Sequence, residues 1–173
     1  MSPVRIAAVG DVHLGTDARG WYRPSLAGIE ERADVLLLAG DLTRHGTLEE
    51  GRVVADEFRG LPIPVVAVLG NHDYHSDVQR EIASMLRDAG ITVLMNESVV
   101  IKCNGTRLGI VGGKGFGGGF AGKCASEFGE REIKDFVGHT KRIAAEWREA
   151  LKNVVADRRV VLSHYSPVKD TLL

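Results

Sequence analysis

Four unbroken apolar runs, each ending at a short polar signature, constrain the fold of this chain more than any other feature. The runs cover residues 6–9, 35–39, 65–69 and 160–162. Strands with so little polar alternation are buried on both faces, as in sheets that are covered by helices. Helical stretches separate the first three runs, which predicts a mainly parallel sheet with right-handed crossovers. The predicted fold class is therefore α/β.

Polar side chains follow each run directly. They are Asp11, His13, Asp41, Asn71, His72, Asp73 and His164. Because ligands of open α/β folds bind at the carboxyl ends of the strands, we expect these side chains to meet at one edge. Each signature alone has a plainer explanation, such as a helix cap or a polar turn. Their shared topological position favours a site for divalent or trivalent metal ions, and hence a metal-dependent hydrolase.

Four helices are predicted from apolar spacing and from capping or breaking residues. They cover residues 24–33, 48–58, 76–89 and a long stretch that starts near Glu130 or Thr140 and ends near Val155. Pro24 at the start of the first helix and Gly90 after the last turn of the third support their limits. Between the third and fourth helices, residues 99–111 predict a hairpin around a tight turn at Asn104-Gly105. We expect its antiparallel strands to join the sheet.

A glycine-rich stretch at residues 112–122 matches two nucleotide-binding patterns superficially. Residues 113–118 fit G-x-G-x-x-G, but the required strand–turn–helix context is missing. Residues 117–124 resemble a P-loop, but Cys124 stands where a magnesium-binding Ser or Thr belongs. We expect either a flap beside the metal site or an ordinary surface loop.

Composition limits the partners. The formal net charge is −1 and there is no basic stripe, which speaks against a nucleic-acid groove or a membrane surface as the target. Neither a secretory leader nor a membrane-length apolar segment is seen in the sequence, and the two cysteines form no close pair. We predict a cytoplasmic protein. At 173 residues the chain is expected to form a single domain, residues 1–173.

The ordered set Gly-Asp-x-His, Gly-Asp-x, Gly-Asn-His-Asp and a later strand-end His resembles the calcineurin-like metallophosphoesterases, from Ile6 to Pro167. The resemblance implies a four-layer α/β/β/α sandwich with mixed sheets and a centre of two metal ions, drawn from Mn, Fe and Zn. It also implies hydrolysis of a small phosphoester by a metal-bridging hydroxide that attacks phosphorus in line. The ester is either a monoester or a diester, and a nucleotide is one candidate.

The same resemblance implies a role for each polar residue. Asp11 and His13 would hold the first metal, Asp41 would bridge both, and Asn71 and His164 would hold the second. In the following pair, His72 would face the leaving group without binding metal, and Asp73 would orient His72.

One departure from the family pattern is the absence of a final Gly-His-x-His, which would complete both metal spheres. We therefore expect a domain truncated at its carboxyl end, without its last strands. An alternative function is kept open for the same reason: a catalytically silent scaffold of this fold that binds partner proteins. The oligomeric state has no signal in the sequence.

Several further side chains are candidates for contact with the substrate. His45 and His75 follow the second and third signatures closely, and Trp21-Tyr22 is either an aromatic wall of the site or part of the core rim. Four cations are candidate phosphate clamps or simply solvated charges: Arg23, Arg44, Lys114 and Lys123.

Overall fold

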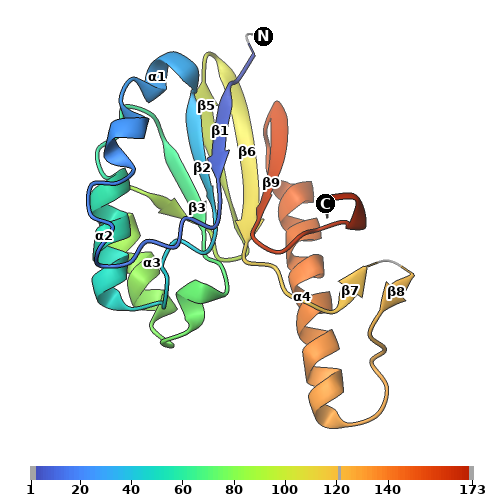
Figure 1. Cartoon of the computed structure of the whole chain (residues 1–173). Helices are drawn as coiled ribbons and strands as arrows, with labels where there is room; N and C mark the ends of the chain where they lie inside the picture. The colour runs from blue at the N-terminus through green and yellow to red at the C-terminus, as the bar shows by residue number, and fades with distance from the viewer. Residues whose placement is uncertain (1–2, 121, 172–173) are drawn as a thin grey trace.

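Two facing sheets with helices on their outer sides make up the computed structural model, which describes residues 3–120 and 122–171 (Figure 1). The first sheet has the strand order β1 (Ile6–Val9), β2 (Val35–Ala39), β3 (Val65–Val68) and β4 (Thr92–Val93). All of its strand pairs are parallel, with Ala7 beside Leu36. The parallel sheet predicted from the apolar runs is therefore confirmed.

The outer helices of this sheet lie between its strands in the chain. They are η1 (Arg23–Leu26), α1 (Ile29–Arg32), α2 (Leu48–Phe58), η2 (His72–Tyr74) and α3 (Gln79–Asp88). The prediction of one helix over residues 24–33 is wrong, because extended backbone at Ala27 (ψ 130°) separates a 3-10 turn from a single α-turn. In contrast, α2 begins as predicted, at a capping box in which Thr47 and Glu50 bind each other's backbone amides.

The second sheet has the order β5 (Glu97–Cys103), β6 (Thr106–Gly113) and β9 (Arg158–Ser163). β5 and β6 are antiparallel and form the predicted hairpin, whereas β6 and β9 are parallel. The expectation that the hairpin would extend the first sheet is wrong. The physical reason lies in the apolar face of β6, where Leu108 and Ile110 pack against the first sheet rather than lengthening it.

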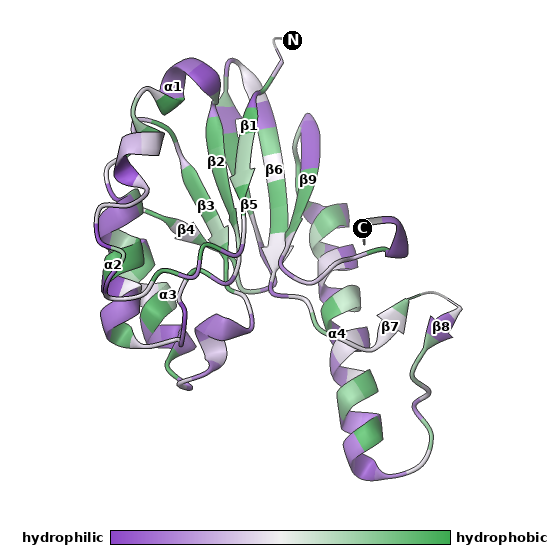
Figure 2. Ribbon diagram, viewed as in Figure 1, coloured by the Kyte–Doolittle hydropathy of each residue, from purple (hydrophilic) through white to green (hydrophobic). Residues whose placement is uncertain are grey.

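Two apolar layers explain why the central strands carry unbroken apolar runs. On one face of the first sheet, Leu36 and Leu38 pack against the helices. On the other face, Val35, Leu37 and Val66 pack against the second sheet. Figure 2 shows these strands as hydrophobic and the outer faces of the helices as hydrophilic. Each strand face buries apolar surface, which stabilises the stack by roughly 25 cal/mol per Å².

The long helix α4 (Arg131–Asn153) forms the fourth layer beside β5 and β6, so the predicted α/β/β/α sandwich is confirmed. Glu130 is its N-cap, which selects the earlier of the two predicted starts. The first turns of α4 extend away from the sheets, alongside the short hairpin of β7 (Gly119–Phe120) and β8 (Lys123–Cys124) (Figure 1).

The glycine-rich stretch begins at the end of β6, includes β7 and ends just before β8, and Ala121 lies outside the described residues. In the described part, the strand β7 rather than a helix follows Gly118, and the next helix after Cys124 begins only at Arg131. Neither nucleotide-binding pattern therefore has the structural context it requires. Cys103 is buried, Cys124 is exposed, and both are free thiols. No helix within residues 3–120 and 122–171 is long and apolar enough to cross a membrane.

Two arginine–aspartate pairs tie chain segments that are far apart in sequence. Arg5 Nη2 lies 2.9 Å from Asp34 Oδ1, and Arg107 Nη2 lies 2.9 Å from Asp157 Oδ1. Side-chain hydrogen bonds from these arginines lower the pKa of each carboxyl group from 3.8 to about 2. Because the folded pKa is lowered, the stabilisation is complete above pH 4 or so and is lost as the pH falls towards about 2.

We expect Asp34→Asn and Asp157→Asn to flatten the loss of stability between about pH 4 and pH 2, since each removes one titrating carboxylate. Urea unfolding at a series of pH values measures this, and each variant should differ most from the unsubstituted protein at neutral pH. Equal slopes for all three proteins over the acid range would contradict the assignment.

Candidate metal centre

The backbone after β1 and β2 adopts a conformation that is rare outside glycine. Asp11, His13 and Asp41 have φ values of 53°, 45° and 50°. Hydrogen bonds between the two loops hold this conformation, from the Asp11 amide to the Gly40 carbonyl (3.1 Å) and from the His13 amide to the Asp41 carbonyl (3.0 Å). Such strained residues cluster at functional sites, where the surrounding structure over-determines them.

Asp41 lies at the centre of the predicted cluster, with a carboxylate that is 6% exposed. His164 Nε2 lies 3.3 Å from Asp41 Oδ1, while His13 Nε2 and His72 Nε2 lie 3.7 Å and 3.9 Å from Asp41 Oδ2. Donor atoms group into two triads, His13–Asp41–His72 and Asp11–Asp41–His164, each within 4.8 Å. Asp41 is the one residue that the two triads share.

Two imidazoles are held in the tautomer that binds metal through Nε2. His164 Nδ1 lies 3.0 Å from the Ala39 carbonyl and His72 Nδ1 lies 2.7 Å from the Arg44 carbonyl. A carbonyl only accepts, so Nδ1 donates in both rings and a neutral ring keeps its lone pair on Nε2. That lone pair of His164 faces Asn71 Oδ1 at 3.0 Å as well as Asp41. Converging lone pairs repel one another, and a cation between them removes the repulsion.

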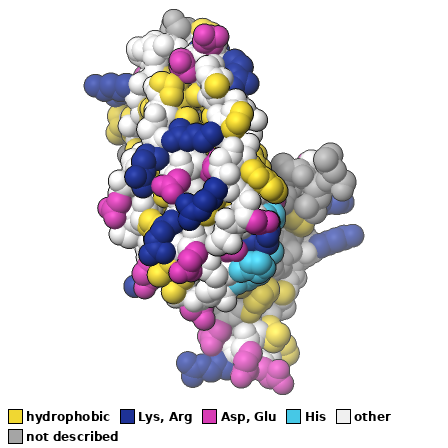
Figure 3. Space-filling model, turned by 60° about the vertical axis from the view of Figure 1, so that its left-hand side comes forward, with side chains coloured by type: hydrophobic (Ala, Val, Ile, Leu, Met, Phe, Trp, Pro, Cys, Tyr) yellow, Lys and Arg dark blue, Asp and Glu magenta, His cyan; other side chains and the backbone are white. Residues whose placement is uncertain are grey.

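The structure thus fits a metal site, and it brings all five predicted ligands together. The donors are carboxylate, amide and imidazole groups, which suit Mn, Fe or Zn. The grouping differs in two respects from the one that the resemblance implies, because His72 Nε2 lies in a triad with His13 and Asp41, and Asp11 lies in a triad with His164 rather than with His13. Figure 3 shows the histidine side chains gathered in one patch of this face, with Asp or Glu and Lys or Arg side chains beside them.

Asp73 does not orient His72, contrary to the sequence-based expectation. Its fully buried carboxylate accepts hydrogen bonds from the amides of Leu42, Thr43 and Gly70 and from the Thr43 hydroxyl, at 2.6–3.2 Å. The His72 ring is instead oriented by the Arg44 carbonyl. Asp73 therefore joins the loop after β2 to the loop after β3, and so positions Asp41 relative to His72.

Two glycines allow these loops to approach each other, a role that the sequence reasoning missed. A Cβ on Gly70 would lie 2.1 Å from Asp41 Oδ1, and a Cβ on Gly40 would lie 2.7 Å from His164 Cγ. Neither contact is physically possible without displacing the polar residue. The signal was present in the sequence, since a glycine precedes the polar residue in three of the four signatures.

The other candidates for contact with the substrate differ in how near they lie to the cluster. The His75 ring lies 4.4 Å from the His72 ring, at the edge of the cluster. His45 instead pairs with Glu50, its Nδ1 2.9 Å from Oε1. Burial raises the pKa of Glu50, but hydrogen bonds from His45 and Thr47 outweigh it and lower that pKa overall. Trp21 is 64% exposed, whereas the neighbouring Tyr22 ring packs against the core at Phe58.

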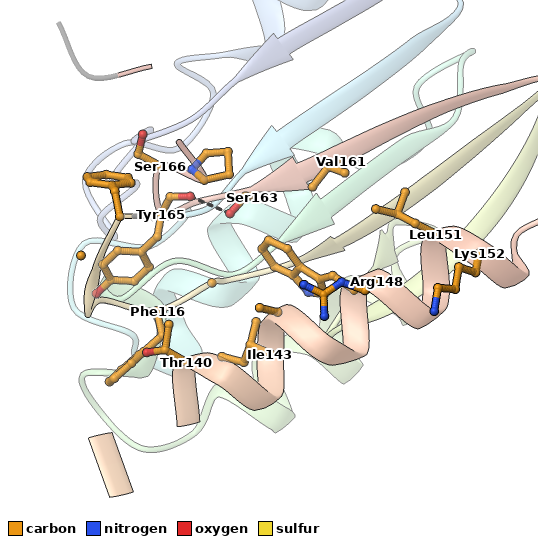
Figure 4. Close-up of a pocket in the computed structure, with 16 residues that line it drawn as sticks. Phe116, Thr140, Ile143, Arg148, Leu151, Lys152, Val161, Ser163, Tyr165 and Ser166 are labelled. Carbon is orange, nitrogen blue, oxygen red and sulfur yellow. Dashed lines mark hydrogen bonds between the residues drawn. The ribbon is translucent and has the colours of Figure 1, made fainter. Parts of the chain in front are cut away.

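An apolar groove of about 740 Å³ lies between α4 and β9, to one side of the metal-binding cluster (Figure 4). Ile143, Trp147 and Leu151 of α4 form one wall, as the predicted apolar stripe of that helix. Tyr165 borders the end nearest the cluster, with its ring 5.5 Å from that of His164. The groove is thus adjacent to the cluster but contains none of its donors.

The sequence matches a known family of proteins. The sequence profile of the calcineurin-like phosphoesterase family matches residues 4–171. The chain therefore belongs to the calcineurin-like phosphoesterase family, as its four signatures predicted.

The chain is also similar to one curated protein and to one solved structure. Phosphodiesterase YaeI of Escherichia coli (strain K12) is 33% identical over 101 residues, which are 56% of this chain and 36% of YaeI. The chain thus spans about a third of the length of this curated relative. A solved crystal structure superposes with a TM-score of 0.53 at 16% identity, covering 98% of this chain and 72% of the other, and supports the fold.

We expect Asp73→Ala to destabilise the protein by about 3 kcal/mol or more, because each buried donor left unpaired costs about 1–3 kcal/mol. Asp73→Asn should cost less, since it preserves the shape and one acceptor oxygen. Urea unfolding measures both variants. A loss below about 1 kcal/mol for the alanine variant would show that these bonds do not hold the loops together.

Proposed function

We propose that this protein is a metal-dependent phosphoester hydrolase whose site is centred on Asp41. The observation that carries the proposal is that one buried carboxylate belongs to two separate donor triads. A carboxylate shared by both triads would be available to two cations at once, the arrangement that two-metal phosphoesterases use. Membership of the calcineurin-like phosphoesterase family supports the same conclusion.

By the family resemblance, five residues would hold the ions: Asp11 and His13 on one side, Asn71 and His164 on the other, and Asp41 between them. The observed triads instead put Asp11 with His164 and His13 with His72, and both contain Asp41. When bound, two Mn, Fe or Zn ions would polarise the phosphoryl oxygens and activate a water for in-line attack. Asp41 contributes negative charge that offsets the repulsion between two cations. Asn71 supplies a neutral oxygen donor, which keeps the site from repelling an anionic substrate.

His72 is proposed as the residue that faces the leaving group. Its Nε2 is directed towards the cluster while its Nδ1 is fixed by the Arg44 carbonyl. When protonated at Nε2, this ring would donate a proton to the departing alkoxide. Asp73 is proposed as a positioning residue, because its hydrogen bonds hold the loops that carry Asp41 and His72.

The proposed substrate is a small phosphoester. The name of YaeI, a phosphodiesterase, favours a diester over a monoester, and a nucleotide is one member of that class. The near-neutral charge of the chain argues against a long nucleic acid. A cytoplasmic location remains a prediction from the sequence. The alternative of a silent scaffold is separated by metal analysis, since a scaffold has no need of two bound ions.

We expect Asp41→Ala to remove both metal ions and to reduce phosphoester hydrolysis by more than about a hundredfold, beyond the effect of losing an outer hydrogen-bond partner. Elemental analysis after loading with Mn²⁺, together with turnover of an aryl phosphodiester, measures this. Asp56→Asn, on the exposed surface of α2, is the control and should change neither quantity. Full turnover by a metal-free Asp41→Ala variant would refute the proposal.

We expect His72→Ala to retain both ions and to slow turnover by about a hundredfold, mainly for esters with a poor leaving group. An ester with an acidic phenol as its leaving group should be affected much less, because that group departs without a proton. Loss of one equivalent of metal in the variant would instead make His72 a ligand, as its triad with His13 and Asp41 allows.

A further inference from the structure

The structure distinguishes the four cations that the sequence offered as phosphate clamps. Arg23 Nη2 donates to the Arg59 carbonyl at 2.7 Å, and Arg44 Nη1 pairs with Asp17 at 3.2 Å. Lys123 is exposed on β8, in the hairpin that extends away from the sheets (Figure 1). The two arginines thus have other partners, and Lys123 lies in the β7–β8 hairpin. Of the four cations, Lys114 remains as the candidate phosphate-binding residue.

Lys114 occupies the same topological position in the second sheet as the metal-binding signatures occupy in the first. It follows β6 directly, and His164 follows β9. These strands are parallel, with Gly113 beside Ser163, and the Tyr165 amide donates to the Lys114 carbonyl at 2.9 Å. The register therefore places Lys114 beside His164, at the edge of the sheet where the metal cluster lies.

Three aromatic rings surround the Lys114 ammonium. Nζ lies 4.9 Å from the ring centroids of Tyr74 and Phe116 and 5.2 Å from that of Tyr165. Two of the rings are next to site residues in sequence, since Tyr74 follows Asp73 and Tyr165 follows His164. Tyr165 and Phe116 lie at the end of the groove opposite Leu151 and Lys152 (Figure 4). Such ring faces hold a cation in a fixed place.

The Lys114 ammonium has no carboxylate within ion-pair distance among the residues that the structure describes, although it is half-buried. Burial lowers the pKa of this amine, and the more distant charge of Asp41 acts in the opposite direction. A partly desolvated cation without a bound anion is costly unless something else compensates. The rings compensate in part, and an anion at the adjacent metal cluster would complete the compensation.

We propose that Lys114 is a phosphate-binding residue, whose ammonium donates to a non-bridging oxygen of a phosphoryl group held at the metal centre. The proposal rests on the proposed function, because the phosphoryl group has to occupy the site around Asp41. The flexible stem of lysine allows Nζ to approach a bound oxygen without movement of the backbone. The rings then act as the wall that directs the ammonium towards the site.

The test uses the whole chain loaded with Mn²⁺ and inorganic phosphate as the probe, with binding measured by titration calorimetry. Lys114→Met keeps an unbranched stem among the rings but removes the charge. We expect it to weaken phosphate binding by about tenfold or more, the usual value of a hydrogen bond to a charged group. The Mn²⁺ content and the unfolding temperature should not change, whereas a purely structural role would alter the latter.

Three further variants serve as controls. Lys114→Arg keeps the charge and should recover part of the phosphate affinity, and Lys123→Met should bind phosphate as the unsubstituted protein does. Lys114→Gln is a second neutral variant, in case the methionine variant is unstable. If both neutral variants fail to fold, the lysine is structural and the proposal is wrong.

Two outcomes separate this inference from the proposed function. Unchanged phosphate affinity in Lys114→Met, with Mn²⁺ bound, overturns the role of Lys114 and leaves the proposed function intact. Equal weakening in Lys123→Met also overturns it, because the effect would then reflect overall charge. Failure of the unsubstituted protein to bind Mn²⁺, Fe²⁺ or Zn²⁺ would overturn both.

Discussion

The buried carboxylate of Asp73 is the constraint on which the site depends. Its hydrogen bonds reach the amides of Leu42, Thr43 and Gly70, so it fixes the loop after β2 against the loop after β3. The His72 amide in turn donates to Asp41 Oδ1 at 2.8 Å. Through these bonds the Asp73 carboxylate, which lies outside both donor triads, sets the position of the Asp41 carboxylate that the triads share.

Strained backbone and close packing serve the same purpose. Asp11, His13 and Asp41 are held at positive φ by hydrogen bonds between neighbouring loops, and Gly70 has no side chain because Asp41 occupies that space. The two-sheet core stabilises the fold enough to offset this strain, since residues such as Leu38 and Val66 are fully buried in apolar layers. Stability from the core thus supports a site that is locally unfavourable.

Much of the fold and most of the site followed from local pattern. The runs at β2 and β3 predicted buried parallel strands, and the polar residues after them predicted the edge at which Asp41, Asn71 and His164 meet. Where prediction failed, the cause was a contact between distant segments. Sequence adjacency suggested that Asp73 orients His72, but its carboxylate binds amides about thirty residues earlier, which no local pattern reports.

By itself the sequence determined which polar residues follow the strands and are the candidates for the site, because burial on both faces requires unbroken apolar runs. Only the tertiary structure decided that the hairpin of β5 and β6 forms a second sheet with β9. That choice depends on the packing of Leu108 and Ile110 against the first sheet. The tertiary structure also decided which of the four cations lies beside His164. It is Lys114, because β6 pairs with β9 although the two strands are far apart in sequence.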